Sequence, residues 1–186
     1  KINELDDPDV FLWFIRSVQQ YAEYRSIEQA ATRFGDIVIR IINFIKKQNH
    51  PNLFMHNNNL LYVNGTEKPA TWMSAVENNQ PITPRTGYVV EINALWYNAL
   101  KFTSILERQA GNEQSADLLD YQAEIARDSF IKVFWNGTYL YDYVIDEHRN
   151  MEVRSNMIIA VGLPFSPLDK QQQKSVVDIT TKELLT

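Results

Sequence analysis

The feature of this sequence that most constrains its fold is a run from about residue 88 to residue 110 that keeps a helical period and is apolar on most of its sides. A helix that is apolar nearly all round lies inside its domain, because every side needs cover from other elements. We therefore predict a central, buried helix over 88–110. The chain has 186 residues, of which 45% are hydrophobic and 22% charged, so length and composition fit one globular domain covering residues 1–186.

Apolar residues at helical spacing predict five further helices. The acidic, proline-containing segment before Val10 favours a helix start, and Ser26 and Asp169 are the expected N-caps of two others. Proline at position 51 ends the second helix. The predicted ranges are about 8–24, from Ser26 to His50, from Glu113 or Ser115 to Trp135, Met157–Val161 and about 169–185. Consecutive helices then form three helical hairpins in an all-α fold.

Residues 52–88 have a different character and interrupt the helical pattern. Three asparagines precede Leu60-Leu61-Tyr62-Val63, and Asn64-Gly65 is a turn dipeptide, which together predict a small β-hairpin. The rest of this segment carries Trp72, Ile82 and Tyr88, which argues for a folded, functional loop. A second short strand or extended lip is predicted over 139–144, where polar and apolar residues alternate.

Composition excludes several functions. The net charge of -5 is spread along the chain with no block of Lys or Arg, so nucleic acid is not an expected partner. No apolar run reaches the roughly 18 residues of a membrane span, so we predict no membrane association. The chain has no Cys and only three scattered His, so no metal site is expected. No glycine-rich phosphate loop or nucleophile elbow is present, and we expect no cofactor.

Aromatic and polar residues around the 71–87 loop suit a sugar ring, which has an apolar face and a rim of hydroxyls. The loop residue Trp72 is the strongest candidate. Trp13 and Trp96 lie in apolar helical runs, which are more typical of a core position than of a ligand contact. The other aromatic candidates are Tyr97, Tyr139, Tyr141 and Tyr143.

Charged candidates flank the start of the central helix. Arg85 precedes it, and Glu91 lies in its first turn, where a carboxylate favours the helix dipole. The two either form a structural ion pair or place Glu91 where it accepts hydrogen bonds from a ligand. Glycoside hydrolysis needs two carboxylates, but no spacing selects a pair. The loop carboxylates are Asp6, Asp7, Asp9, Glu67, Glu77, Asp142, Asp146 and Glu147.

The segments Thr71-Trp72-Met73, Thr83-Pro84-Arg85-Thr86-Gly87 and Val90 to Leu100 closely resemble the amylo-α-1,6-glucosidase domain of glycogen debranching enzymes. The start of the chain, with Asp9 and Leu12-Trp13-Phe14, is similar to the family's opening segment. Near the other end, Arg154-Ser155-Asn156 is similar to a segment that reads Arg-Pro-Asn-Gln in the family. The resemblance thus covers essentially the whole chain.

This resemblance implies an (α/α) barrel of six helical hairpins, a toroid of which the chain would be a partial barrel of about three. It implies inverting hydrolysis of α-1,6-glucosidic branch points of glycogen or limit dextrin by an acid and a base, without a metal or cofactor. The expected partner is an α-glucan, including maltooligosaccharides, and the expected location is the cytoplasm. The implied substrate-binding residues are Asp9, Trp13, Trp72, Arg85, Glu91, Trp96, Tyr97 and Asn156.

One departure from the family pattern bears on activity. The family has Asp after Thr-Trp-Met, in the place of the general acid, and this chain has Ser74. A serine hydroxyl cannot replace a carboxylic acid as proton donor, and loss of a general acid costs about 10²–10⁴ in rate. Glu77, three residues further on, is a substitute only where the loop coils back.

We further expect the catalytic base beyond Thr186, so the chain alone is expected to be inactive. Its uncovered helix faces are expected to cause either self-association or marginal stability. The alternatives are a non-catalytic glucan-binding or scaffolding protein on the same barrel, and a hydrolase of this fold acting on another sugar.

Overall fold

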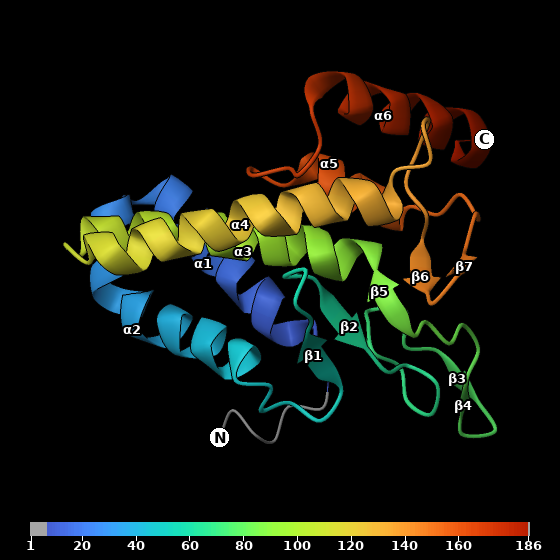
Figure 1. The fold of residues 1–186 in the computed structure, drawn as a ribbon, viewed down its shortest axis with the longest axis horizontal. Helices are drawn as coiled ribbons and strands as arrows, with labels where there is room; N and C mark the ends of the chain where they lie inside the picture. Colours follow the sequence, from blue (N-terminus) through green and yellow to red (C-terminus); the bar gives the residue numbers. More distant parts are fainter. Residues whose placement is uncertain (1–6, 186) are drawn as a thin grey trace.

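The computed structural model of the protein describes residues 7–185 and shows a mostly helical fold with two small antiparallel sheets (Figure 1). Asp6, one of the loop carboxylates named above, lies outside this range. The helices are α1 (Val10–Tyr24), α2 (Ile27–Lys46), α3 (Val90–Gln109), α4 (Glu113–Phe134), α5 (Asn156–Gly162) and α6 (Lys170–Leu184). The strands are β1 (Leu53–Met55), β2 (Leu61–Val63), β3 (Val76–Glu77), β4 (Gln80–Pro81), β5 (Gly87–Val89), β6 (Tyr143–Ile145) and β7 (His148–Arg149).

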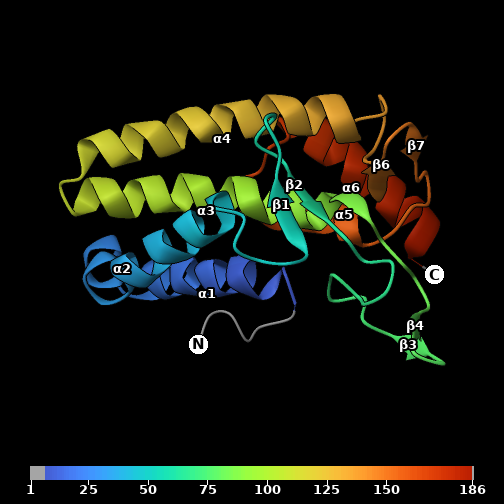
Figure 2. The same cartoon turned by 60° about the horizontal axis from the view of Figure 1, so that its bottom comes forward.

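The predicted central helix is α3, and its position is confirmed. Most of its residues are buried, including polar ones such as Asn93, Asn98 and Thr103. It packs against α1, α2, α4 and α5, and the turned view shows α4 on one side of it and the α1–α2 pair on the other (Figure 2). An all-round apolar helix is stable here because neighbours cover each of its faces.

The remaining helices also follow the sequence prediction, and consecutive helices pack as the pairs α1–α2, α3–α4 and α5–α6. The Ser26 side chain accepts a hydrogen bond from the backbone N–H of Gln29 and so caps α2. Asp169 forms a capping box with Gln172 at the start of α6. Local signals were sufficient for these ends because a cap is made by residues adjacent in sequence.

The sheet is larger than predicted. Five strands pair in the order β1-β2-β5-β6-β7, so the β1–β2 hairpin is one edge of a sheet instead of an isolated hairpin, and the all-α prediction is corrected to mostly α. The turn of this hairpin lies at residues 56–60, with Asn59 at a φ of 57°. The predicted turn dipeptide Asn64-Gly65 lies after β2 and is not part of the hairpin turn. The strand predicted over 139–144 is instead β6, which begins at Tyr143.

Strand β5 connects this sheet directly to α3, and Gly87 makes the connection possible. Gly87 has a φ of 110°, and a Cβ atom there would lie 2.2 Å from the backbone oxygen of Val144 on β6. Only glycine allows strands β5 and β6 to approach this closely in this backbone conformation. Within residues 7–185, none of the helices is both long enough and apolar enough to cross a membrane.

Candidate functional site

Three segments that are distant in sequence meet at the N-terminal end of α3. Arg85 comes from the loop before β5, Glu91 from the first turn of α3, and Asp142 from the residue before β6. All three side chains are buried, with exposed fractions of 3%, 0% and 1%. We refer to Arg85, Glu91 and Asp142 as the ion cluster.

Arg85 holds the ion cluster together through both of its terminal nitrogens. Its guanidinium forms a bidentate contact with Glu91, in which Nη1 pairs with Oε1 and Nη2 lies 2.7 Å from Oε2. Nη2 also donates to the Asp142 carboxylate at 2.8 Å and to its backbone oxygen at 3.1 Å. The same backbone oxygen accepts a hydrogen bond from the N–H of Val90. Arginine suits this role because its planar fork binds two carboxylates at once.

The charges in the ion cluster interact strongly because water is excluded. Burial raises the pKa of Glu91, and the hydrogen bonds and charge of Arg85 oppose that rise. Burial by itself lowers the pKa of Arg85, but the hydrogen bonds and charges of Glu91 and Asp142 outweigh this effect. The pKa of Arg85 is therefore raised overall, and the guanidinium stays charged. One cation then faces two carboxyl groups. Arg154, whose Nε lies 3.5 Å from Oδ2 of Asp142, supplies a second positive charge from the cluster's more exposed side.

A chain of hydrogen bonds links the ion cluster to the surface. Asn156, at the start of α5, donates from Nδ2 to Asp142 Oδ1 at 2.7 Å. Its Oδ1 accepts from the indole N–H of Trp72 at 3.1 Å. Trp72 is held in position through this contact although 54% of its surface is exposed. The exposed indole therefore has a fixed orientation, which a loop tryptophan without a partner would lack.

Trp72 lines an open hollow of about 540 Å³, together with Met73, Ser74, Ala75, Ile82 and Thr83. Ile82, like Trp72, is largely exposed. An exposed indole beside hydroxyl groups is the combination of apolar face and polar rim that sugar rings bind. We call this feature the Trp72 hollow.

Asp9 is a buried carboxyl close to the ion cluster. It precedes α1 and is 5% exposed. Its pKa is raised to about 6, first by burial and then by the negative charge of Asp7, with a smaller contribution from Glu91. A hydrogen bond from the Trp13 side chain opposes this shift. The effect of the Glu91 charge shows that the predicted residues Asp9 and Glu91 lie in one electrostatic environment.

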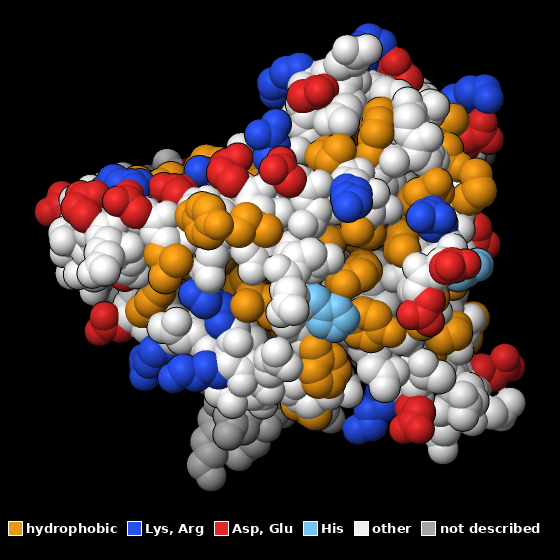
Figure 3. Space-filling view, in the orientation of Figure 1, with side chains coloured by type: hydrophobic (Ala, Val, Ile, Leu, Met, Phe, Trp, Pro, Cys, Tyr) orange, Lys and Arg blue, Asp and Glu red, His pale blue; other side chains and the backbone are white. Residues whose placement is uncertain are grey.

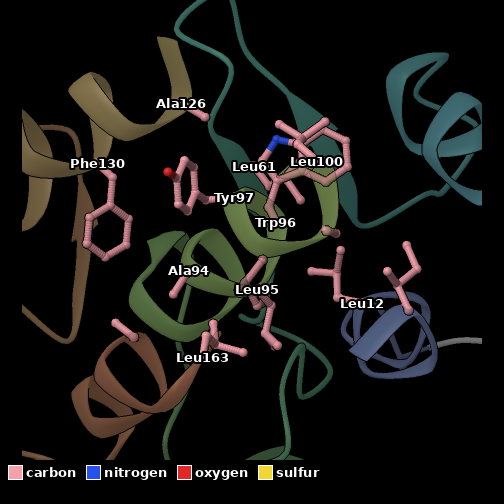
Figure 4. Close-up of a cluster of buried hydrophobic side chains, with 14 of the residues drawn as sticks. Leu12, Leu61, Ala94, Leu95, Trp96, Tyr97, Leu100, Ala126, Phe130 and Leu163 are labelled. Atoms are coloured by element: carbon pink, nitrogen blue, oxygen red, sulfur yellow. The ribbon is translucent and has the colours of Figure 1, made fainter. Parts of the chain in front are cut away.

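The structure does not bring Trp96 and Tyr97 to the Trp72 hollow. Both are buried in the core, and they point from α3 in different directions (Figure 4). The Trp96 indole lies near Leu61 and donates to the backbone oxygen of Asn59, whereas Tyr97 points toward Phe130 of α4. Of the alternatives open for the helical tryptophans, the core position is the one that Trp96 occupies. Trp13 is half-buried and packs against the core.

Ser74 and Glu77 occupy different positions in the loop. Ser74 is exposed and lines the Trp72 hollow, with its backbone N–H bonded to the oxygen of Trp72 at 2.9 Å. Glu77 is exposed on β3, opposite Gln80 of β4, and is not among the residues that line the hollow. The structure therefore places Ser74 at the Trp72 hollow and Glu77 in the β3–β4 hairpin.

The sequence did not single out two residues of the site, Asp142 and Arg154. Asp142 was one of eight loop carboxylates, and its strand-like surroundings gave no sign that it turns inward to Arg85. Arg154 stands directly before Ser155-Asn156 in a segment that resembles the family, and that adjacency was the available signal. The described range 7–185 contains no group of three or more His, Asp or Glu placed to hold a metal ion.

The geometry defines a helix-rich domain with an exposed aromatic hollow that is linked to a buried ion cluster. The family profile of amylo-alpha-1,6-glucosidase matches residues 5–186. The chain belongs to this family, and the resemblance inferred from its motifs is thereby confirmed. No curated protein matches the chain.

Removing the cation of the ion cluster should destabilise the fold strongly. Arg85→Met leaves Glu91 and Asp142 buried without their partner, which costs about 3–5 kcal/mol of unfolding free energy. The matched control is Arg108→Met, because Arg108 also contacts several carboxylates but lies at the surface, where water screens its charge, and its loss should destabilise the fold far less. Urea denaturation measures both. Equal losses for the two variants would show that the ion cluster is no more important than a surface network.

Asp9 should make stability depend on pH. Its pKa is about 6 in the folded protein against 3.8 as the ordinary value, so folding favours the protonated form. The stabilisation is complete below pH 4 and is lost as pH rises through 6, by at most about 3 kcal/mol. Urea denaturation between pH 4 and 8 should show this loss in the wild type and not in Asp9→Asn. Parallel profiles for the two proteins would contradict the raised pKa.

Proposed function

We propose that the Trp72 hollow is the α-glucan-binding site of a glycogen-debranching glucosidase domain. The observation that carries this proposal is the continuous chain of contacts from the exposed Trp72 indole through Asn156 to Asp142 and Arg85. It fixes an aromatic face at the surface, and family membership indicates an α-glucan as the ligand. The cytoplasmic location implied by the resemblance is part of the same proposal.

Pre-organisation supports a binding role for this loop. Ordering a flexible tryptophan on binding costs conformational entropy, and a side chain already held by a hydrogen bond avoids most of that cost. Thr71 is tied to the same framework, since its hydroxyl accepts a hydrogen bond from the backbone N–H of Met73 and lies 3.5 Å from Nη1 of Arg85. The residues on both sides of Trp72 are therefore anchored.

The arrangement of the helices supports the proposal of a partial (α/α) barrel within one domain, residues 1–186. The first helices of the three pairs are neighbours, because α3 packs against both α1 and α5. Of the second helices, α2 packs against α1 and α3, α4 packs against α3, and α6 packs against α5. In a ring built from helical hairpins, the first helices stand side by side and the second helices pack outside them. The three pairs in this chain have the arrangement expected of one part of such a ring.

Hydrolysis at this site requires an acid and a base that face each other across the sugar. Ser74 stands where the family's general acid is expected, and none of the six residues that line the Trp72 hollow is a carboxylate. In the proposed function, the inverting reaction on α-1,6 branch points therefore depends on carboxylates from outside this hollow. The second candidate function, glucan binding without turnover, is favoured by the same observation.

Glucan binding can be tested at the Trp72 indole itself. Adding maltoheptaose should shift the indole N–H NMR resonance of Trp72, which is assigned by its absence in Trp72→Ala. Trp72→Ala should weaken binding at this hollow about 5- to 13-fold, because an aromatic contact contributes about 1–1.5 kcal/mol. Tyr24→Ala, which removes an aromatic ring that is 90% exposed elsewhere, should have no effect. A Trp72 resonance that does not respond to maltoheptaose would exclude the hollow as the glucan site.

Replacing Ser74 separates the catalytic from the non-catalytic proposal. In the protein at its full native length, Ser74→Asp should raise the release of glucose from a phosphorylase limit dextrin by about 10²–10⁴, because it restores a proton donor. Thr83→Asp places a carboxylate elsewhere in the same hollow and should have no such effect. High activity in the wild type with no gain in Ser74→Asp would show that Ser74 is not the acid position. Binding without turnover in both proteins would support the non-catalytic function.

A further inference from the structure

Two further hollows lie between the end of α2 and the surface of α4. Two adjoining hollows of about 510 and 320 Å³ share Asn58 and Tyr88, and we call them together the outer groove. The larger hollow extends to Gln48 after α2, and the smaller one extends to Lys132 on α4. None of the residues that line the outer groove lines the Trp72 hollow. Figure 3 shows this face, on which hydrophobic side chains gather over the sheet with lysine and arginine near them.

His56, Tyr62 and Tyr88 form an aromatic cluster, of which His56 and Tyr88 line the outer groove and Tyr62 supports them. His56 stacks on Tyr62 with ring centroids 5.1 Å apart, and Tyr88 meets both rings edge-on. The Tyr88 hydroxyl lies 2.7 Å from Nδ1 of His56 and accepts a hydrogen bond from the Asn58 amide. The rings are therefore fixed before any ligand arrives, and a rigid aromatic surface of this kind is suited to the C–H face of a sugar.

Polar groups that are free to bind a ligand surround these rings. Over residues 7–185, Lys132 and Arg149 form no ion pair, and the exposed amide of Asn57 has no hydrogen-bond partner. Sugar hydroxyls accept hydrogen bonds from such donors, and the carboxylate of Asp146 in the smaller hollow can accept one in return. The site thus offers donors and an acceptor around a fixed aromatic centre.

The charge distribution favours a neutral ligand over an anion. The larger hollow is lined by Gln48, Met55, His56, Asn57, Asn58 and Tyr88, with no Asp, Glu, Lys or Arg. In the smaller hollow, Asp146 offsets one of the two cations. A site for phosphate would concentrate its positive charges without a carboxylate beside them.

We propose that the outer groove is a second α-glucan-binding site, which holds a chain of the polymer against the domain while another chain occupies the Trp72 hollow. The choice of an α-glucan rests on the proposed function above, whereas the site itself rests on the geometry of the outer groove. Two sites on one domain raise the apparent affinity for a branched polymer, because the second contact forms at a high effective concentration.

The test compares variants of the two sites with one short and one polymeric ligand. His56→Ala/Lys132→Ala removes an exposed ring and a free cation from the outer groove, and Lys174→Ala on α6 is the exposed control. In calorimetry with maltoheptaose, the wild type should show two sites, and the double variant and Trp72→Ala should each keep one. In electrophoresis through gels containing glycogen, the double variant should lose about tenfold in apparent affinity, and Lys174→Ala should not change. Circular dichroism establishes that each variant is folded.

The outcomes distinguish this inference from the proposed function. Loss of all maltoheptaose binding in Trp72→Ala, with an unchanged double variant, overturns the outer groove and leaves the proposed function intact. Binding that survives in Trp72→Ala and disappears in the double variant supports the outer groove and overturns the Trp72 hollow. Inorganic phosphate that binds the wild type and not the double variant, with no maltoheptaose bound at the outer groove, would show an anion site instead.

Discussion

The interaction on which this structure depends is the contact of one buried guanidinium with two carboxylates. Arg85 joins the loop before β5, the first turn of α3 and the segment before β6, which are separated by up to 57 residues. Removing charges from water is costly, and here the cost is offset by the bidentate geometry and by a hydrogen bond to the backbone oxygen of Asp142. The core helix, the sheet and the surface loop are thereby held in one arrangement.

The same contact explains why the surface loop is ordered. Asn156 extends the network from Asp142 to Trp72, so the position of an exposed indole is set by charges buried behind it. The Ser74 side chain takes no part in these contacts, so the position of the aromatic surface does not depend on the identity of residue 74. In the function proposed above, glucan binding and catalysis are therefore separable.

Much of the fold could be predicted because its signals are local or periodic. The burial of α3 follows from its all-round apolar sequence, and the caps at Ser26 and Asp169 follow from residues one turn apart. Trp72 was the strongest aromatic candidate because it lies in a loop, and the structure leaves it exposed. Predictions failed where several segments meet: the hairpin turn lies near Asn59 instead of Asn64-Gly65, and the predicted hairpin and the strand near residue 143 join β5 and β7 in one sheet.

The sequence by itself determined the helices, the family and the loop that carries the site, because periodicity, capping and motifs are properties of neighbouring residues. Only the tertiary structure decided which charged groups belong to that site. Asp142 resembles any other loop carboxylate until the chain folds it against Arg85, and the sequence leaves Trp96 open between the core and a ligand contact until α3 directs it into the core. The physical reason is that burial and pairing set the behaviour of a side chain, and both arise from contacts between residues far apart in the sequence.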